Sequence, residues 1–306
     1  MLMQQPYRIR TIKEYHKILG VGSPQHPMVS VIDLNEITPY KSEESIKVIF
    51  DFYLISLKKV DVGRVHLGYG QQQYDFDNGI LFFIAPNQVF TFSADQDFKS
   101  SGVMLLIHPD MLWGFPLLKT IKKFEFFGYE INEALFVSEK EENILIGFIK
   151  NIEQEYHSHI DKFSDAIIIS QIESLLNYAD RFYTRQFLTR KISGSQLLDK
   201  LEKILNDHFD EDENVRKGLP TVQHVAGLLN SSPNYLSSVL KTLTGQNTQQ
   251  HIHNKVIEKA KEKLSITTLT ISEIAFELGF EYPQSFSKLF KSKTQLTPVE
   301  YRAAFN

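Results

Sequence analysis

The sequence predicts an α+β protein with a β-rich N-terminal domain, a helical connector, and an all-α C-terminal domain that contains two helix-turn-helix units. Two observations lead to this prediction. Short apolar, β-branched and aromatic runs alternate with turns in the first third of the chain, which is typical of a sandwich or a small barrel. From residue 221 onward, one helical pattern occurs twice, and such a repeat indicates a duplicated structural unit. We expect the domains to span 1–137, 138–215 and 216–306.

The repeat consists of two pairs of short helices. Sharp turns are expected within the pairs at Asn230 and Gly279, because these residue types most readily adopt a positive φ. Pro233 and Pro283 then favour the first position of a second helix. A helix, a tight turn and another helix form the unit whose second helix lies in a DNA major groove. Each first helix has one apolar face at the spacing i, i+3, i+4, i+7, formed by Val222, Val225, Ala226 and Leu229 in the first copy and by Ile271, Ile274, Ala275 and Leu278 in the second.

Helix ends and a linker complete the pattern. Thr270 with Glu273, and Thr297 with Glu300, are expected to form capping boxes. Between the copies, residues 249–264 carry an apolar residue at every fourth position, so we expect a single helix there. A rigid helix of this kind suits two contacts about one DNA turn apart, ~34 Å.

The second copy resembles the signature of AraC-type transcription regulators. The resemblance lies in Ile-Ala-Phe-Glu-Leu-Gly-Phe at 274–280, Phe-Ser-Lys-Leu-Phe-Lys at 286–291 and Thr-Pro-Val-Glu-Tyr-Arg at 297–302. The first copy is similar in a looser way. This sequence departs from the family pattern at Gln295, which replaces a glycine, and at Ser238, where an arginine is frequent.

The resemblance implies a transcription regulator that binds double-stranded DNA, acts with RNA polymerase and forms a homodimer. A cytoplasmic location is the default expectation, because residues 1–10 have no apolar stretch like that of a secretory signal. It also implies a cupin-like sensory barrel at the N-terminus that binds a small-molecule effector, without a cofactor. The sequence Ala-Pro-Asn at 85–87 is similar to the central turn of such a barrel.

The resemblance further implies which side chains read the bases. Gln284 and Lys288 are four residues apart and share a helix face. Gln and Asn can form two hydrogen bonds with adenine, and Lys can donate to guanine. Alternatively, Lys288 only neutralises a phosphate, because half or more of protein–DNA hydrogen bonds go to the backbone. The candidates are Asn234, Ser237, Ser238 and Lys241 in the first copy and Gln284, Ser287, Lys288 and Lys291 in the second.

The N-terminal domain is expected to be built from short strands. The sequence Asp-Asn-Gly at 77–79 favours a hairpin between 73–76 and 80–83, because type I′ turns prefer Asn-Gly. β-branched and aromatic residues mark further strands, and the apolar runs lie at 46–57, 64–69, 80–84, 89–92 and 103–107.

Polar residues of the strand region are candidates for an effector site. They are Tyr53, His66, Tyr69, Gln71, Gln73 and Tyr74. For any one of them, the alternative is a structural or surface role, since alternation alone does not identify the face. His66 and His108 are the only histidines of this region, and no His-x-His pair with a following Glu provides the spacing of a metal site. We therefore expect neither a metal nor catalytic residues.

Three more helices are expected at 139–159, 164–185 and 196–209. The second has an apolar stripe that includes Ile168, Ile172, Leu175, Leu176 and Ala179. This stripe either covers the barrel or forms part of a subunit interface, since AraC-type proteins commonly pair at this place. An acidic, turn-rich stretch at 210–218 is the expected hinge.

Composition and net charge say less about the function of the protein than the helical repeat does. The net charge is −4, and residues 221–306 carry nine Lys/Arg and six Asp/Glu, or +3, which leaves −7 for the remainder. A charge of +3 fits a DNA-binding surface and an ordinary mixed surface equally well. No stretch approaches the roughly 20 apolar residues of a membrane span. The absence of cysteine excludes a disulfide framework or a thiolate metal site.

Two other classes stay open as alternatives: an enzyme or sugar-binding cupin, and an adaptor that uses the same helices for protein contacts. No nucleophile elbow, phosphate loop or CxxC motif occurs in the sequence, so no catalytic machinery is indicated. A sequence-specific DNA-binding regulator is therefore the function that the sequence favours.

Overall fold

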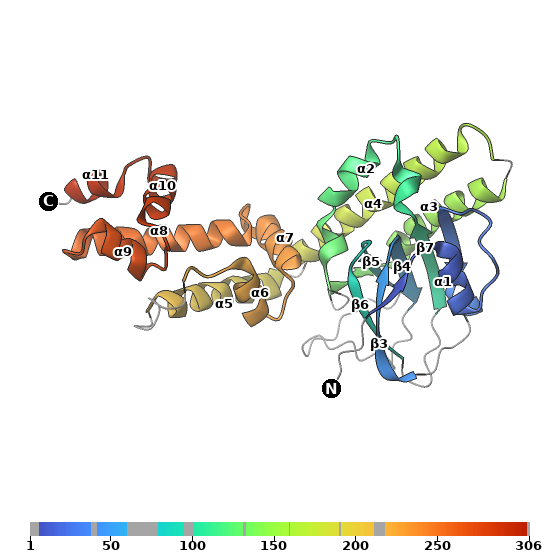
Figure 1. Cartoon of the computed structure of the whole chain (residues 1–306), viewed down its shortest axis with the longest axis horizontal. Helices are drawn as coiled ribbons and strands as arrows, with labels where there is room; N and C mark the ends of the chain where they lie inside the picture. The colour runs from blue at the N-terminus through green and yellow to red at the C-terminus, as the bar shows by residue number, and fades with distance from the viewer. Residues whose placement is uncertain are drawn as a thin grey trace. The chain divides into compact units, whose positions relative to one another are not determined.

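Two β-sheets form the framework of the N-terminal part of the chain. The computed structural model describes residues 6–37, 42–59, 79–94, 101–130, 133–158, 160–189, 191–210 and 218–304. The chain divides into two compact units, Met1–Gln186 and Phe187–Asn306, whose elements are labelled in Figure 1. The helices of the expected connector, 138–215, are shared between these two units.

The described strands of the first unit form two sheets. One has the strand order β1 (Tyr7–Ile9), β3 (Ser42–Phe50) and β6 (Val89–Ala94), and the other has the order β2 (Val29–Asp33), β7 (Ser101–Ile107), β4 (Tyr53–Lys59), β5 (Gly79–Ile84) and β8 (Leu135–Val137). Neighbours pair antiparallel, except that β1 and β3 are parallel. The mixed α+β fold is as predicted. The described strands do not, however, close into the expected cupin-like barrel.

The apolar run at 46–57 is two strands, not one as expected. It contains the end of β3 and most of β4, and these strands belong to different sheets. The chain turns at Asp51 and Phe52. Asp51 is held there because its N–H donates to Ile9 O (3.0 Å) and its carboxylate accepts from Arg8 Nε (2.7 Å). Phe52 is fully buried, so the turn carries a core residue, and composition gives no sign of it.

The other predicted strands have mixed outcomes. The runs at 80–84, 89–92 and 103–107 are confirmed as β5, β6 and β7. The runs at 64–69 and 73–76 and the turn residues 77 and 78 lie outside the described residues. In the turn at 85–87, Asn87 has a φ of 66°, and its N–H donates to Phe50 O (2.8 Å), so this turn fastens the three-stranded sheet at one end.

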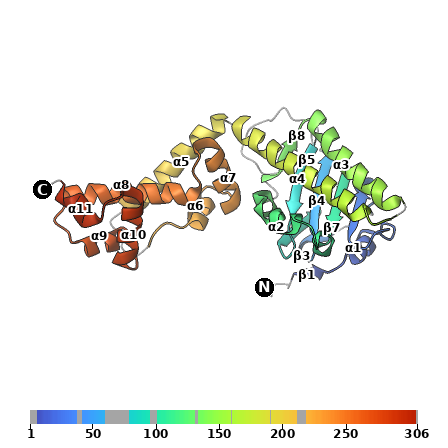
Figure 2. The ribbon, with the colours of Figure 1, turned by 90° about the horizontal axis from the view of Figure 1, so that it is seen from above.

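Two long helices, α3 (Glu139–His157) and α4 (Ser164–Thr189), lie across the five-stranded sheet (Figure 2). The short helices α1 (Ile12–Leu19) and α2 (Leu117–Thr120) complete the described helices of this unit. The Tyr156 hydroxyl accepts from Val31 N (3.1 Å), which fastens α3 to β2. The side chain of Gln186 accepts from Phe136 N (2.8 Å), which fastens α4 to β8.

The apolar stripe on α4 is buried within the single chain. Its members, Ile168, Ile172, Leu175, Leu176 and Ala179, are each at most 1% exposed. Side chains inside one folded chain are not available to a second copy. Of the two alternatives for this stripe, the structure supports the covering role, and a subunit interface would have to use other residues.

The second unit is helical and contains the two predicted helix-turn-helix units. The first is α6 (Val222–Leu228) with α7 (Pro233–Thr244), and the second is α9 (Ile271–Glu277) with α10 (Pro283–Thr294). The helix α8 (Thr248–Ile266) joins them, and α11 (Pro298–Ala303) follows. The expected turns are confirmed, because φ is 51° at Asn230 and 88° at Gly279.

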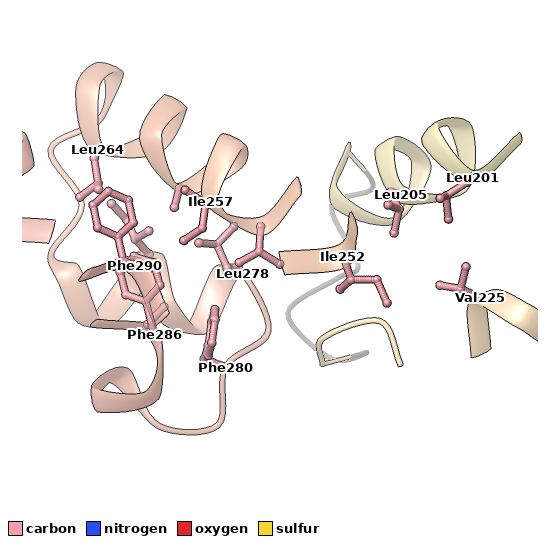
Figure 3. Packing of buried hydrophobic residues seen from close by; sticks show 14 of the residues in the cluster. Leu201, Leu205, Val225, Ile252, Ile257, Leu264, Leu278, Phe280, Phe286 and Phe290 are labelled. Carbon is pink, nitrogen blue, oxygen red and sulfur yellow. The ribbon is translucent and has the colours of Figure 1, made fainter. Parts of the chain in front are cut away.

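One continuous core runs through this unit along α8 (Figure 3). The predicted apolar positions of α8, Ile252, Val256, Ala260 and Leu264, are all buried. Ile252 and Leu264 belong to the same cluster as Val225 of α6 and Phe290 of α10. The helix α5 (Lys191–Asp210) contributes Leu201 and Leu205 to the same core. It therefore belongs to the helix-turn-helix unit and not to a separate connector. Of the expected hinge, residues 211–217 lie outside the described residues.

The turn of the second helix-turn-helix unit touches the segment that precedes the first. A Cβ at Gly279 would lie 2.5 Å from the carbonyl carbon of Gly218, a distance that real Cβ atoms do not reach. The Gly218 carbonyl also lies 3.1 Å from Nε2 of His208 on α5. Gly279 is thus required both for its positive φ and for the close approach of another backbone segment.

Gly279→Ala is expected to destabilise the second unit by at least about 1 kcal/mol, since a left-handed conformation costs an L-residue about 1–2 kcal/mol before any clash. Urea unfolding of the full chain measures this change. Gly227→Ala is the matched control, because Gly227 lies in α6 with open space around it, and alanine there should stabilise by about 0.5–1 kcal/mol. Equal effects of the two substitutions would contradict the contact.

Candidate nucleic-acid interface

The two second helices, α7 and α10, end in the same way. The C-cap residue is left-handed in both, with φ of 76° at Gly245 and 65° at Gln295. Its N–H donates to the carbonyl four residues earlier, at 2.9 Å in each copy. The preceding residue, Thr244 or Thr294, donates its hydroxyl to a helix carbonyl at 2.8 Å. The duplication seen in the sequence therefore extends to individual hydrogen bonds.

Both second helices begin on the predicted proline and bury one face. The side chains on this face are fully buried: Leu236 and Leu240 of α7, and Phe286 and Phe290 of α10. The helix face that carries these residues is directed into the core, so the remaining face is available to a partner. That partner can be DNA only if the exposed face carries suitable donors.

Five of the eight predicted base-reading residues are exposed. They are Asn234 and Lys241 on α7 and Gln284, Lys288 and Lys291 on α10. Ser238 and Ser287 are half-buried, and the Ser287 hydroxyl donates to Pro283 O within its own helix (3.1 Å). The second copy therefore offers one amide and two cations, and the first copy offers one amide and one cation.

Ser237 is placed differently from the other candidates. Its hydroxyl lies 3.0 Å from the hydroxyl of Thr248, a fully buried residue at the start of α8. This hydrogen bond links α7 to α8. The sequence gives no sign of this contact, because the two residues belong to different helices.

Charge pairing separates the lysines of the second helices from those of α8. Lys255 pairs with Glu258 (2.7 Å), Lys259 with Glu262 (3.6 Å) and Lys263 with Glu277 (2.7 Å). Among the described residues, by contrast, no carboxylate lies within 4.0 Å of Lys241, Lys288 or Lys291. Lys241 and Lys288 are therefore exposed and available to an anion such as a DNA phosphate. Lys291 is exposed as well, but its charge lies close enough to Glu300 to contribute to the lowered pKa of that carboxyl group.

The ends of the flanking helices are fixed by the predicted capping boxes. The carboxylate of Glu273 accepts from Thr270 N (2.6 Å), and that of Glu300 accepts from Thr297 N (2.7 Å). These backbone hydrogen bonds, and those from the threonine hydroxyls, lower the pKa of both carboxyl groups. Both glutamates therefore stay ionised at neutral pH and hold the starts of α9 and α11.

The effector candidates of the first unit fall largely outside the described residues. His66, Tyr69, Gln71, Gln73 and Tyr74 belong to that group. Tyr53 is on β4, is half-buried, and has its ring 5.1 Å from that of Phe127 in an edge-to-face contact. Burial raises the pKa of its hydroxyl. Its contact is that of a packed aromatic side chain, which leaves an effector role untested.

A pocket that sequence reasoning did not anticipate lies between α3 and one end of the five-stranded sheet. Its volume is about 250 Å³, and its polar lining includes Asp33, Asn35, Glu142 and Lys150. Among the described residues, no group of three or more His, Cys, Asp or Glu side chains is arranged to hold a metal ion. In the same part of the chain, no helix has the length and apolarity to cross a membrane.

Comparison with known proteins gives matches to the C-terminal part. Residues 225–304 match a family model described as a helix-turn-helix domain. The uncharacterized transcriptional regulatory protein YesN of Bacillus subtilis (strain 168) is 29% identical over 136 residues, which are 44% of this chain and 36% of that protein. The chain thus spans about a third of the length of this curated relative.

Two solved structures are also similar. The C-terminal domain of the two-component response regulator yesN from Fusobacterium nucleatum is 31% identical, with a TM-score of 0.29, over 33% of this chain and 93% of that chain. The C-terminal domain of AraT, a response regulator from Geobacillus stearothermophilus, is 30% identical, with a TM-score of 0.31, over 35% of this chain and 84% of that chain.

Gln295→Gly is expected to stabilise the second unit by up to about 1 kcal/mol, because glycine removes the steric cost of the left-handed C-cap and loses part of the gain to entropy. Gly245→Gln should destabilise by a similar amount. Neither change alters a candidate base-reading side chain, so urea unfolding measures the helix end alone. A loss of stability in Gln295→Gly would mean that the Gln295 side chain contributes more than its strained backbone costs.

Proposed function

Residues 225–304 form an AraC-type helix-turn-helix domain, and on that premise we propose that the chain is a sequence-specific DNA-binding transcription regulator. The observation that carries this proposal is the pair of second helices, α7 and α10, each with exposed amide and lysine side chains. Because α8 joins both helices to one core, two recognition helices are held in one rigid unit. Two such contacts suit successive turns of a DNA major groove, ~34 Å apart.

A mobility-shift assay with competitor DNA tests the proposal. The full chain should select a sequence from a random DNA pool and keep that preference in excess non-specific DNA. An adaptor that used the same helices for protein contacts would fold but select no sequence. The relatives reported above are regulators and not enzymes, which disfavours the enzyme alternative.

In the proposed complex, the second copy supplies most of the discrimination between sequences. Gln284 can form two hydrogen bonds with adenine, and Lys288 can donate to guanine O6 and N7. In the first copy, Asn234 has the same capacity as Gln284. Ser238, however, is short and half-buried, so it contributes less than Lys288 at the equivalent place.

Lys288→Ala is expected to cost ~1–3 kcal/mol on the best DNA site and to relax the preference at one base pair, if Lys288 reads a base. If Lys288 contacts only phosphate, all sequences should weaken alike. Titrations of the selected site and its single-base variants distinguish these outcomes. Gln284→Ala should reduce specificity more than Ser238→Ala, and equal losses at both positions would mean that the reading faces are wrongly assigned.

The first unit is proposed to bind a small-molecule effector. The candidates are the region around Tyr53 and the pocket bounded by α3. An effector that binds the folded unit stabilises it by mass action, by about 2.7 kcal/mol at a concentration one hundred times its Kd. Through linkage, the same effector must shift the affinity for DNA by the factor with which DNA shifts its own binding.

A thermal-shift screen of sugars and small organic acids should therefore find a compound that raises the Tm, and that compound should change the Kd for DNA in the same preparation. A compound that raised the Tm without any change in DNA affinity would show a binding site uncoupled from regulation. A metal-dependent enzymatic activity residing in residues 1–137 would contradict the sensory role.

We also propose that the chain forms a homodimer. A homodimer would place two copies of the helix-turn-helix domain on one DNA segment, and RNA polymerase is the partner through which a regulator of this class acts. The dimer must use a surface other than the buried stripe on α4. Exposed apolar residues at the start of α4, Phe163 (58%) and Ile167 (40%), provide one such surface.

A further inference from the structure

Two hydrogen bonds meet at the side chain of Asn254 on α8. Its Nδ2 donates to Gln246 Oε1 at 2.8 Å, and its Oδ1 accepts from Lys293 Nζ at 3.2 Å. Gln246 directly follows the C-cap residue of α7, and Lys293 lies in the last turn of α10. One side chain thus joins the C-terminal ends of the two second helices.

The chemistry of this link requires a side chain that donates to one partner and accepts from the other. A lysine ammonium only donates, so the oxygen of Asn254 must face Lys293, and its NH₂ group then faces the oxygen of Gln246. Aspartate would keep the acceptor and lose the donor, and alanine would lose both. Asn254 serves both partners at once, with separate donor and acceptor atoms.

The link is a contact between the copies and not a repeated local motif. In the second copy, Leu296 stands where Gln246 stands in the first, and Ala304, the C-cap residue of α11, stands where Asn254 stands, so neither polar side chain has a counterpart. Lys293 also differs from Lys255, Lys259 and Lys263 of α8, which pair with glutamates. The charge of Lys293 also acts on His253: burial is the larger cause of the lowered pKa of the His253 imidazole, and the nearby Lys293 ammonium is the second.

We propose that Asn254 is a positioning residue, which fixes the distance and angle between α7 and α10 and so sets the spacing of DNA half-sites that the protein accepts. The effect on half-site spacing rests on the proposed function. The three side chains lie at the surface, and a hydrogen bond of this kind contributes modestly to stability. Loss of Asn254 should therefore loosen the pair of helices without unfolding the unit.

A distance measurement tests the positioning role without DNA. The chain contains no cysteine, so Asn234→Cys and Gln284→Cys place two spin labels at exposed, equivalent positions of α7 and α10. The otherwise unchanged chain should give one narrow distance distribution, and Asn254→Ala should broaden it. Ser265→Ala is the matched control, because Ser265 is exposed on the same helix and bonds only to α8 carbonyls. An unchanged distribution in Asn254→Ala overturns the proposal.

A DNA-binding measurement tests the consequence for spacing. Asn254→Ala should weaken binding to the selected two-half-site DNA by about twofold to tenfold, the effect of losing one or two pre-ordered side chains. One base pair inserted between the half-sites should cost the unaltered chain more affinity than it costs Asn254→Ala. Equal penalties in the two proteins would contradict the role in spacing.

A double-mutant cycle separates this role from a direct phosphate contact by Lys293. Gln246→Ala and Lys293→Met should be non-additive in DNA binding, and the coupling should vanish in the Asn254→Ala background, because the two residues meet only through Asn254. If Lys293 instead holds a phosphate, Lys293→Met alone reduces the salt slope by about 1, the cycle is additive, and the proposal fails.

The two measurements keep this inference distinct from the proposed function. If the unaltered chain selects no DNA sequence, the regulator assignment fails, and the spin-label distances still decide whether Asn254 fixes the helices. If Asn254→Ala leaves those distances unchanged while DNA selection is intact, the regulator assignment stands and the positioning role fails.

Discussion

Burial of one face of α8 is the constraint on which the C-terminal unit depends. The residues at every fourth position enter the core that α6, α9 and α10 share, so neither helix-turn-helix unit can close its core without this helix (Figure 3). Its 19 residues extend about 28 Å at 1.5 Å per residue, a length similar to one DNA turn. Core packing along α8 thus sets the approximate spacing of the two second helices, and the proposed Asn254 link narrows it further.

The lysines on the surface of this unit fall into two groups, those paired with glutamates and those without a nearby carboxylate. Three lysines of α8, Lys255, Lys259 and Lys263, are paired with glutamates, whereas Lys241 of α7 and Lys288 of α10 are exposed with no carboxylate within 4.0 Å among the described residues. A modest net charge of +3 for residues 221–306 therefore still leaves local positive charge at the proposed reading faces. On the proposed function, this arrangement favours selective contacts over strong non-specific attraction to DNA.

Sequence alone predicted the parts of the fold that depend on local periodicity and backbone conformation. The helix pairs, the turn at Gly279 and the capping box at Thr270 follow from residues close together in the chain. The sequence did not predict to which unit α5 belongs, because an amphipathic pattern shows that a helix packs on a core and does not identify that core. The link through Asn254 was equally invisible, since it joins exposed polar residues on different helices. The buried stripe around Leu175 fitted two interpretations until the exposure of its side chains was known.

Hydroxyl-radical footprinting of the full chain on a DNA site selected from a random pool shows directly whether the two second helices bind DNA as one unit. We expect two protected patches on one face of the duplex, with centres about 10 base pairs (~34 Å) apart for each bound domain. Their separation is set by the rigid unit around α8 and should be the same on every selected site. A single patch per domain, or two patches whose separation varies from site to site, would contradict the claim that two helices joined to one core read DNA together.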